Sequence, residues 1–374
     1  MTTTWRRVSP FLVLAGVMLL ARSDTRRTAA IATPPARDPT APLKDADTGN
    51  RHTTDPAEMT DPTRGRQADS PVEIPARGWN DILLRTRKEF SEDQIPLVAA
   101  GVTFYTLLAL FPGLGAFVAL YGLFADVAQA REHLQVLAFM LPADTLAFIG
   151  EQMVRIATAK EGGLSFAFVF GLLASIWSAN GAVKALITGL NIAYEEKEER
   201  KWLRSTLTSL AFTIGLLVFV MASIALVAAA PAIDTFGGSQ AGVVFRVVSW
   251  PLLVVALGLG LALLYRFGPS RKLVKWSWIS WGSGVALLLW VLASVAFSIY
   301  VGNFANYDKT YGPLGALIGF MTWMWLSSMV ILLGAELNAE IEHQTAKDTT
   351  TGAPRPLGER GATMADTVGE RQGR

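Results

Sequence analysis

Residues 311–340 read YGPLGALIGFMTWMWLSSMVILLGAELNAE, and the rest of the chain is organised around this stretch. It carries no charge from Pro313 to Ala335, which as a helix is long enough to cross a hydrocarbon core of roughly 30 Å. Gly315 and Gly319 form a GxxxG step, a small-residue notch typical of close helix contacts in membranes. The stretch therefore predicts a membrane-spanning helix that packs closely on a neighbour.

Composition excludes several classes of function. The chain has 374 residues, of which 51% are hydrophobic and 17% are charged, and its net charge is only +2. Soluble domains are usually about a quarter charged, and nucleic-acid-binding domains are usually strongly basic. Cysteine is absent, and the three histidines lie far apart outside the apolar segments. We therefore predict no nucleic-acid partner, no cofactor, no metal site and no catalytic residues.

The apolar segments predict an all-α fold, a polytopic membrane helix bundle with six transmembrane helices and a disordered tail at each end. Each segment is a continuous apolar run that is long enough to span a bilayer as a helix. The expected spans are 97–125, 164–190, 207–233, 247–265, 276–305 and 313–339.

The segments that flank the bundle are polar. Residues 1–78 are rich in Pro, Thr, Ala, Asp and Arg, and are predicted to be either a disordered extension or a mis-annotated one. Whether the natural start is Met1 or Met59 stays open. Residues 79–345 are expected to form the six-span membrane domain, and residues 346–374 a disordered cytoplasmic tail.

The distribution of Lys and Arg predicts the orientation. Basic residues gather before the first span, in the linker 195–204 and in the linker 266–275, whereas the alternate loops are poor in them. Both termini are therefore expected in the cytoplasm. Residues 79–92 are predicted to form an interfacial helix with Arg85 reaching lipid headgroups, and residues 144–160 a second surface helix.

Polar residues inside or at the ends of the spans are the candidate site. Burying a charge at the bilayer centre costs at least ~2.5–3.5 kcal/mol, so such residues need a reason to be there. The candidates for a translocation path or polar cluster are Tyr105, Asn180, Lys184, Glu336 and Asn338.

Each candidate also has a structural interpretation. Lys184 can extend its side chain to the headgroups, or it can pair with Glu336, which lies at a similar depth on a parallel span. Asn180 can hold two helices together by a hydrogen bond, and Tyr105 can be a packing residue. Pro112 predicts a helix kink, with a broken helix as the less favoured alternative.

Two stretches resemble the YihY/virulence factor BrkB family of bacterial inner-membrane proteins. Residues 99–112, AAGVTFYTLLALFP, are similar to the family's FYxLLSLFP signature, with Ala109 where many members have serine. The YGxxGA…GAELNAE pattern of residues 311–340 and the step from Asn191 to Tyr194 fit as well. The resemblance covers about residues 80–345 and implies a multi-pass protein of the bacterial plasma membrane.

The resemblance implies little about chemistry. The family was once labelled as a ribonuclease, and some members are linked to serum resistance or envelope lipid phenotypes, but no catalytic residue transfers. The leading prediction is transport or translocation of a small or lipidic solute, with membrane lipids as partners. The alternative is a non-transporting envelope assembly or scaffold protein, and a membrane-bound nuclease is a distant third. Substrate, direction, energy source and oligomeric state stay open.

Overall fold

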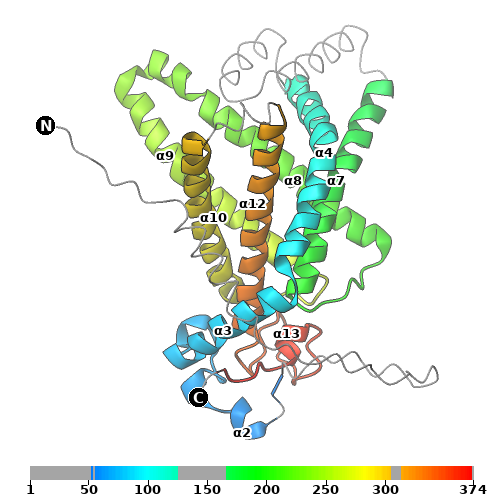
Figure 1. Ribbon diagram of the computed structural model, residues 1–374, viewed down its shortest axis with the longest axis vertical. Helices are drawn as coiled ribbons and strands as arrows, with labels where there is room; N and C mark the ends of the chain where they lie inside the picture. The colour runs from blue at the N-terminus through cyan, green and yellow to red at the C-terminus, as the bar shows by residue number, and fades with distance from the viewer. Residues whose placement is uncertain (1–51, 54, 125–165, 305–312, 373–374) are drawn as a thin grey trace, which may run out of the picture. The chain divides into compact units, whose positions relative to one another are not determined.

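The computed structural model describes residues 52–53, 55–124, 166–304 and 313–372 (Figure 1). Over these residues the fold is helical, without a strand, and only two isolated bridges join extended residues, His52 with Gly369 and Val274 with Thr350. The long helices are α4 (Ile95–Phe124), α7 (Phe166–Ala193), α8 (Trp202–Ala228), α9 (Ala230–Phe267), α10 (Trp276–Phe304) and α12 (Pro313–Glu342). The shorter elements are α2 (Pro56–Met59), η1 (Pro62–Arg64), η2 (Pro71–Glu73), α3 (Ala76–Glu92) and α13 (Thr363–Asp366).

The helices confirm the predicted all-α membrane bundle. Among the described residues, five helices are each long and apolar enough to cross a membrane. A sixth span is reached if α3 and the first part of α4, which meet at an angle of 58°, count as one bent span. The helix α4 runs for 30 residues without a charge and continues through Pro112. The sharp bend therefore lies before α4, at the junction with α3.

The predicted outer loop between the third and fourth spans is helical instead. The helix α9 begins at Ala230, directly after the end of α8 at Ala228, and Pro231 stands in its first turn. Proline suits that position because backbone N–H groups in the first turn of a helix have no intrahelical acceptor, so the missing N–H of proline costs no hydrogen bond. The predictions made for residues 1–51 and for the surface helix 144–160 lie outside the described residues.

The closest helix crossing lies at a different glycine pair from the predicted one. A Cβ added to Gly334 of α12 would lie 2.5 Å from the Tyr265 hydroxyl and 2.6 Å from Cβ of Ala286 on α10. A Cβ added to Gly282 of α10 would collide with the Asn338 side chain and the Gly334 carbonyl. A Cβ on Gly319 would meet open space, so Gly319 is not where α12 makes a tight contact.

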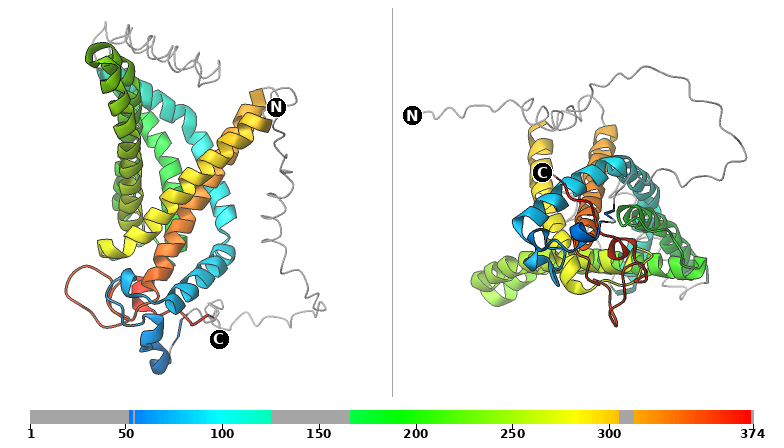
Figure 2. Two further views of the ribbon diagram at one scale, coloured as in Figure 1. Left: turned by 90° about the vertical axis from the view of Figure 1, so that its left-hand side faces the viewer. Right: turned by 90° about the horizontal axis from the view of Figure 1, so that it is seen from below.

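The hydrophobic core gathers at one end of the bundle, which we call the tail-side end because α3, α13 and the segments beside them lie there (Figures 1 and 2). Trp278, Tyr265, Leu190, Leu332 and Ile95 are almost fully buried at this end. Many apolar side chains further along α8, α9 and α10 are more than a third exposed, as expected for helices that face lipid.

Parts of the two polar flanking segments lie among the described residues and contact the bundle. Arg66 is fully buried, and its guanidinium donates to the carbonyls of Gln344 (3.2 Å) and Gly369 (2.6 Å). Thr345 donates to the carbonyl of Ala68 at 2.8 Å. Polar segments were expected to lack a core, but here buried arginines satisfy backbone carbonyls that a composition count does not consider. Residues 50–374 form one compact unit.

Candidate functional site

Polar side chains are buried where α12 reaches the tail-side end of the bundle. Six of them, which we call the α12 polar cluster, are no more than 2% exposed: Glu336, Asn338, Glu340, Glu342, His343 and Gln344. They close a helix that is apolar over most of its length, and the sequence alone would place several of them in water. The neighbouring segments cover them instead, so each needs a hydrogen-bond or charge partner.

Arg85 of α3 neutralises the middle of this cluster. Its Nε donates to Oε2 of Glu340 (2.5 Å), and its Nη2 donates to Oε1 of Gln344 (2.6 Å). Its Nη1 donates to the carbonyl of Glu370 at 2.8 Å. Arg85 lies on the buried stripe of α3, with Ile82 and the other inward-facing positions spaced three or four residues apart. The expected contact of Arg85 with headgroups is therefore replaced by an ion pair with α12.

A second ion pair closes the end of α12. Arg271, from the linker between α9 and α10, donates to Oε2 of Glu342 at 2.6 Å, and its guanidinium lies 4.4 Å from the centre of the Tyr194 ring. Thr349 donates to the other oxygen of Glu342 at 2.7 Å. The buried pair with Glu342 raises the pKa of Arg271, although desolvation acts in the opposite direction.

Glu336 differs from Glu340 and Glu342 because its Oε1 is buried and has no hydrogen-bond partner. The Nδ2 atom of Asn338 and the hydroxyl of Tyr194 are also buried, and these two side chains lie close enough to interact with each other. Asn338 uses its Oδ1 to accept from the backbone N–H of Gly282 at 2.9 Å. The two ion pairs thus lie beside a buried carboxylate oxygen of Glu336 that has no hydrogen-bond partner.

His343 of the α12 polar cluster contacts His52 of the N-terminal segment. Nδ1 of His52 lies 3.0 Å from Nε2 of His343, so one of the two rings donates and the other accepts. His343 Nδ1 lies 3.6 Å from Glu340 Oε2, and His52 Nε2 lies 3.9 Å from Glu195 Oε2. Segments far apart in the sequence are joined through this chain of side chains.

The structure separates most of the residues that the sequence singled out. Lys184 Nζ donates to Thr206 of α8 at 3.3 Å and lies 5.4 Å from the centre of the Trp177 ring. No ion pair joins Lys184 to Glu336 in the described part of the chain, and both side chains lie in it. The predicted Lys184–Glu336 pair is therefore replaced by a contact between α7 and α8.

The remaining candidates have structural surroundings. Asn180 is 1% exposed and accepts a hydrogen bond from Thr213 of α8 at 3.0 Å. This bond joins α7 to α8, as the structural interpretation of Asn180 expected. Tyr105 is 50% exposed and contacts the neighbouring Phe104 ring, away from the polar cluster. Of the five candidates, Glu336 and Asn338 alone lie in the buried cluster.

Sequence reasoning missed the partners of the cluster. Arg85 and Arg271 resemble ordinary interfacial arginines, and nothing in their local sequence predicts burial. Tyr194 gave a signal, since it belongs to the Asn191–Tyr194 step noted above. Asn191 accepts from the N–H of Ser270 at 2.8 Å, which places the end of α7 against the linker that carries Arg271.

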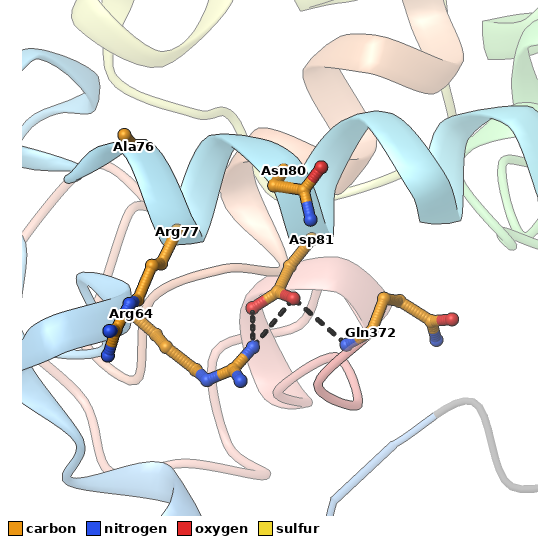
Figure 3. Close-up of a pocket in the computed structure, with 6 residues that line it drawn as sticks. All are labelled: Arg64, Ala76, Arg77, Asn80, Asp81 and Gln372. Atoms are coloured by element: carbon orange, nitrogen blue, oxygen red, sulfur yellow. Dashed lines mark hydrogen bonds and ion pairs between the residues drawn. The ribbon is translucent and has the colours of Figure 1, made fainter. Parts of the chain in front are cut away.

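An open pocket of about 390 Å³ lies beside the cluster, at the start of α3 (Figure 3). It is lined by Arg64, Ala76, Arg77, Asn80, Asp81 and Gln372. Asp81 is fully buried, and both of its oxygens accept from Nη1 of Arg64 at 2.7 Å, while Oδ1 also accepts from the N–H of Gln372. Because its buried carboxylate is already paired, this pocket is a weaker candidate than the α12 polar cluster.

Comparisons with known proteins identify the family. A family model described as virulence factor BrkB matches residues 86–357. YfkH of Bacillus subtilis, which carries a ribonuclease-like name, is 29% identical over 248 residues, covering 64% of this chain and 88% of that protein. A UPF0761 membrane protein of Idiomarina loihiensis is 23% identical over 261 residues, covering 68% of this chain and 88% of its own. Another from Tolumonas auensis is 24% identical over 271 residues, covering 70% and 85%. No solved structure matches the chain.

Proposed function

Because the chain belongs to the virulence factor BrkB family, and its UPF0761 relatives are named as membrane proteins, we propose that it transports or translocates a small or lipidic solute across the membrane. The observation that supports this proposal is the carboxylate of Glu336, which is buried at the end of a span with one oxygen unpartnered. The solute path is expected to run beside α12, where it meets α4 and α7.

The argument rests on what a buried polar group costs. Leaving a buried donor or acceptor without a partner costs roughly 1–3 kcal/mol, and stable proteins leave few such groups. Glu336 Oε1 lacks a hydrogen-bond partner, whereas Glu340 and Glu342 are each paired with an arginine nearby. A buried carboxylate with an unused oxygen is suited to a passing solute or to water that accompanies it.

We propose that the protein is not an enzyme. The carboxylates of the cluster that have partners are held by arginines, an arrangement that fixes charge rather than activating a nucleophile. YfkH carries a ribonuclease-like name, whereas the UPF0761 proteins of Idiomarina loihiensis and Tolumonas auensis are named only as membrane proteins.

A scaffold is the second candidate, and the two ion pairs favour it. Arg85 with Glu340 and Arg271 with Glu342 join α3, α12 and the α9–α10 linker through side chains at most 3% exposed. A rigid tail-side end of this kind suits a protein that holds envelope partners in place. On this view the unpartnered oxygen of Glu336 would serve no transport.

The proposed location is the bacterial plasma membrane, with both termini in the cytoplasm. The basic linkers 195–204 and 266–275 both lie at the tail-side end, as the positive-inside rule expects for the cytoplasmic face. A reporter fused after Glu199 should therefore give a cytoplasmic signal, and a periplasmic signal there would reverse the orientation.

Labelling of a single cysteine distinguishes transport from scaffolding. The chain has no cysteine, so Ser328→Cys can be labelled without background. Ser328 is 7% exposed and lies eight residues before Glu336, about 12 Å along α12 at 1.5 Å per residue. Transport predicts that a polar, water-borne maleimide reaches this position in membranes. The matched control is Leu288→Cys, on the lipid-facing surface of α10 at 60% exposure, which should stay unlabelled. Equal protection of both positions would favour the scaffold.

A further inference from the structure

Arg266, one residue before the end of α9, is a partly buried cation without an ion-pair partner among the described residues. Its Nε and Nη1 atoms are buried and have no hydrogen-bond partner. Its guanidinium lies 4.3 Å from the centre of the Trp276 ring and 5.6 Å from that of Phe267. No carboxylate lies within ion-pair distance of Arg266 in the described part of the chain, although Arg200 and Arg271 nearby each have one.

The surroundings of Arg266 are those of a membrane interface. It lies in the last turn of a span that ends at Phe267, and the next span begins at Trp276 (Figure 1). Phe267 and Trp276 are 40% and 46% exposed, and Trp202, which begins the span of α8, is 69% exposed. Aromatic residues at the ends of adjacent spans mark the depth of the lipid headgroups. The unneutralised guanidinium is therefore at headgroup level.

The α10 terminus next to Arg266 adds to the positive field. The first turn of α10 contains no acidic residue, and the helix dipole places partial positive charge there. Arg200 does not compete for the same ligand, because it pairs with Glu198 at 2.6 Å and donates to the Gly268 carbonyl at 2.9 Å. An anion that approaches from the membrane therefore meets one free guanidinium held on an aromatic face.

We propose that Arg266, with Trp276 and Phe267, binds the phosphate of an anionic phospholipid headgroup at the tail-side interface. Arginine is suited to phosphate because its planar fork presents parallel N–H donors. The guanidinium donates to the phosphate oxygens, while the aromatic rings lie beside the acyl chains. This site is independent of the proposed transport.

Native mass spectrometry of the purified protein tests the proposal. The wild type should retain phosphatidylglycerol at least fivefold better than phosphatidylcholine. Arg266→Gln should weaken retention of phosphatidylglycerol about tenfold, equivalent to ~1.4 kcal/mol. Arg266→Lys keeps the charge but loses the fork, so its loss should be intermediate. The control, Arg204→Gln, removes an exposed arginine from the start of α8 and should bind as the wild type does.

Three results would overturn the assignment. The wild type holding both lipids equally would exclude an anionic-lipid site without recourse to any variant. An equal loss in Arg204→Gln would show that general surface charge, not this site, retains the lipid. Displacement of phosphatidylglycerol by millimolar inorganic phosphate would assign the guanidinium to a soluble phosphate instead.

Discussion

Removing Arg85 should strongly destabilise the tail-side end of the bundle. In Arg85→Met the carboxylate of Glu340, 2% exposed, loses the guanidinium that donates to it, and Gln344 and the Glu370 carbonyl lose a donor as well. Breaking a buried ion pair by removing one partner costs roughly 3–5 kcal/mol, because a charge stays buried without compensation. His343, 3.6 Å from Glu340, is the remaining cationic group within reach and offsets this only when protonated.

Unfolding by denaturant in detergent, followed by tryptophan fluorescence, measures the loss. Arg87→Met is the matched control, since Arg87 is exposed on the same helix, and it should change the free energy of unfolding by less than about 0.5 kcal/mol. The double variant Arg85→Met with Glu340→Gln should be milder than the sum of the single changes by about 1–3 kcal/mol. An Arg85→Met protein as stable as the Arg87→Met protein would refute the ion-pair reasoning.

Three further predictions concern neighbouring features. The effects of Lys184→Met and Glu336→Gln on the free energy of unfolding should add within about 0.5 kcal/mol, because Lys184 contacts Thr206 and Trp177 rather than Glu336. A larger departure from additivity would show that Lys184 and Glu336 do interact. Burial raises the pKa of Glu196 from 4.5 to about 7, so folding takes up a proton. Attachment of α13, whose Thr363 N–H donates to Glu196 at 2.8 Å, should weaken as pH rises from about 4.5 to 7 and then level off. Limited proteolysis of the C-terminal segment across that range checks this, and Glu196→Gln should abolish the pH dependence. Gly334→Ala should lower the melting temperature, since its Cβ would lie 2.5 Å from the Tyr265 hydroxyl, whereas Gly319→Ala should not.

The fold class followed from the sequence because length and hydropathy largely determine whether a segment crosses a membrane. The apolar stretches gave the long helices, and the positions of the spans agree within several residues at most ends. The segment between residues 233 and 247 was expected to be a loop between two apolar spans, while the structure continues as helix. The contacts between spans could not be derived, since a GxxxG step indicates where a close approach is sterically allowed and not which partner occupies it.

The candidate site could be predicted only in part. Glu336 and Asn338 were found because a carboxylate and an amide at the end of an apolar helix require partners. Their actual neighbours come from α3, α7 and the α9–α10 linker, so Arg85 and Arg271 could be recognised only once these segments were folded together. The pairing of Lys184 with Glu336 rested on equal depth along two helices. Depth does not fix which way a side chain points around the helix axis, and Lys184 points toward α8.

Side-specific labelling of Ser328→Cys tests the central claim of translocation most directly. Right-side-out and inverted vesicles are each treated with a membrane-impermeant maleimide, with Leu288→Cys as the lipid-facing control in both. A protein that moves a solute past α12 must open this position to water on each side in turn, so labelling is predicted in both preparations and should be slower when Glu336 is changed to Gln. Labelling from neither side, with Ser328→Cys as protected as the Leu288→Cys control, would contradict the transport proposal.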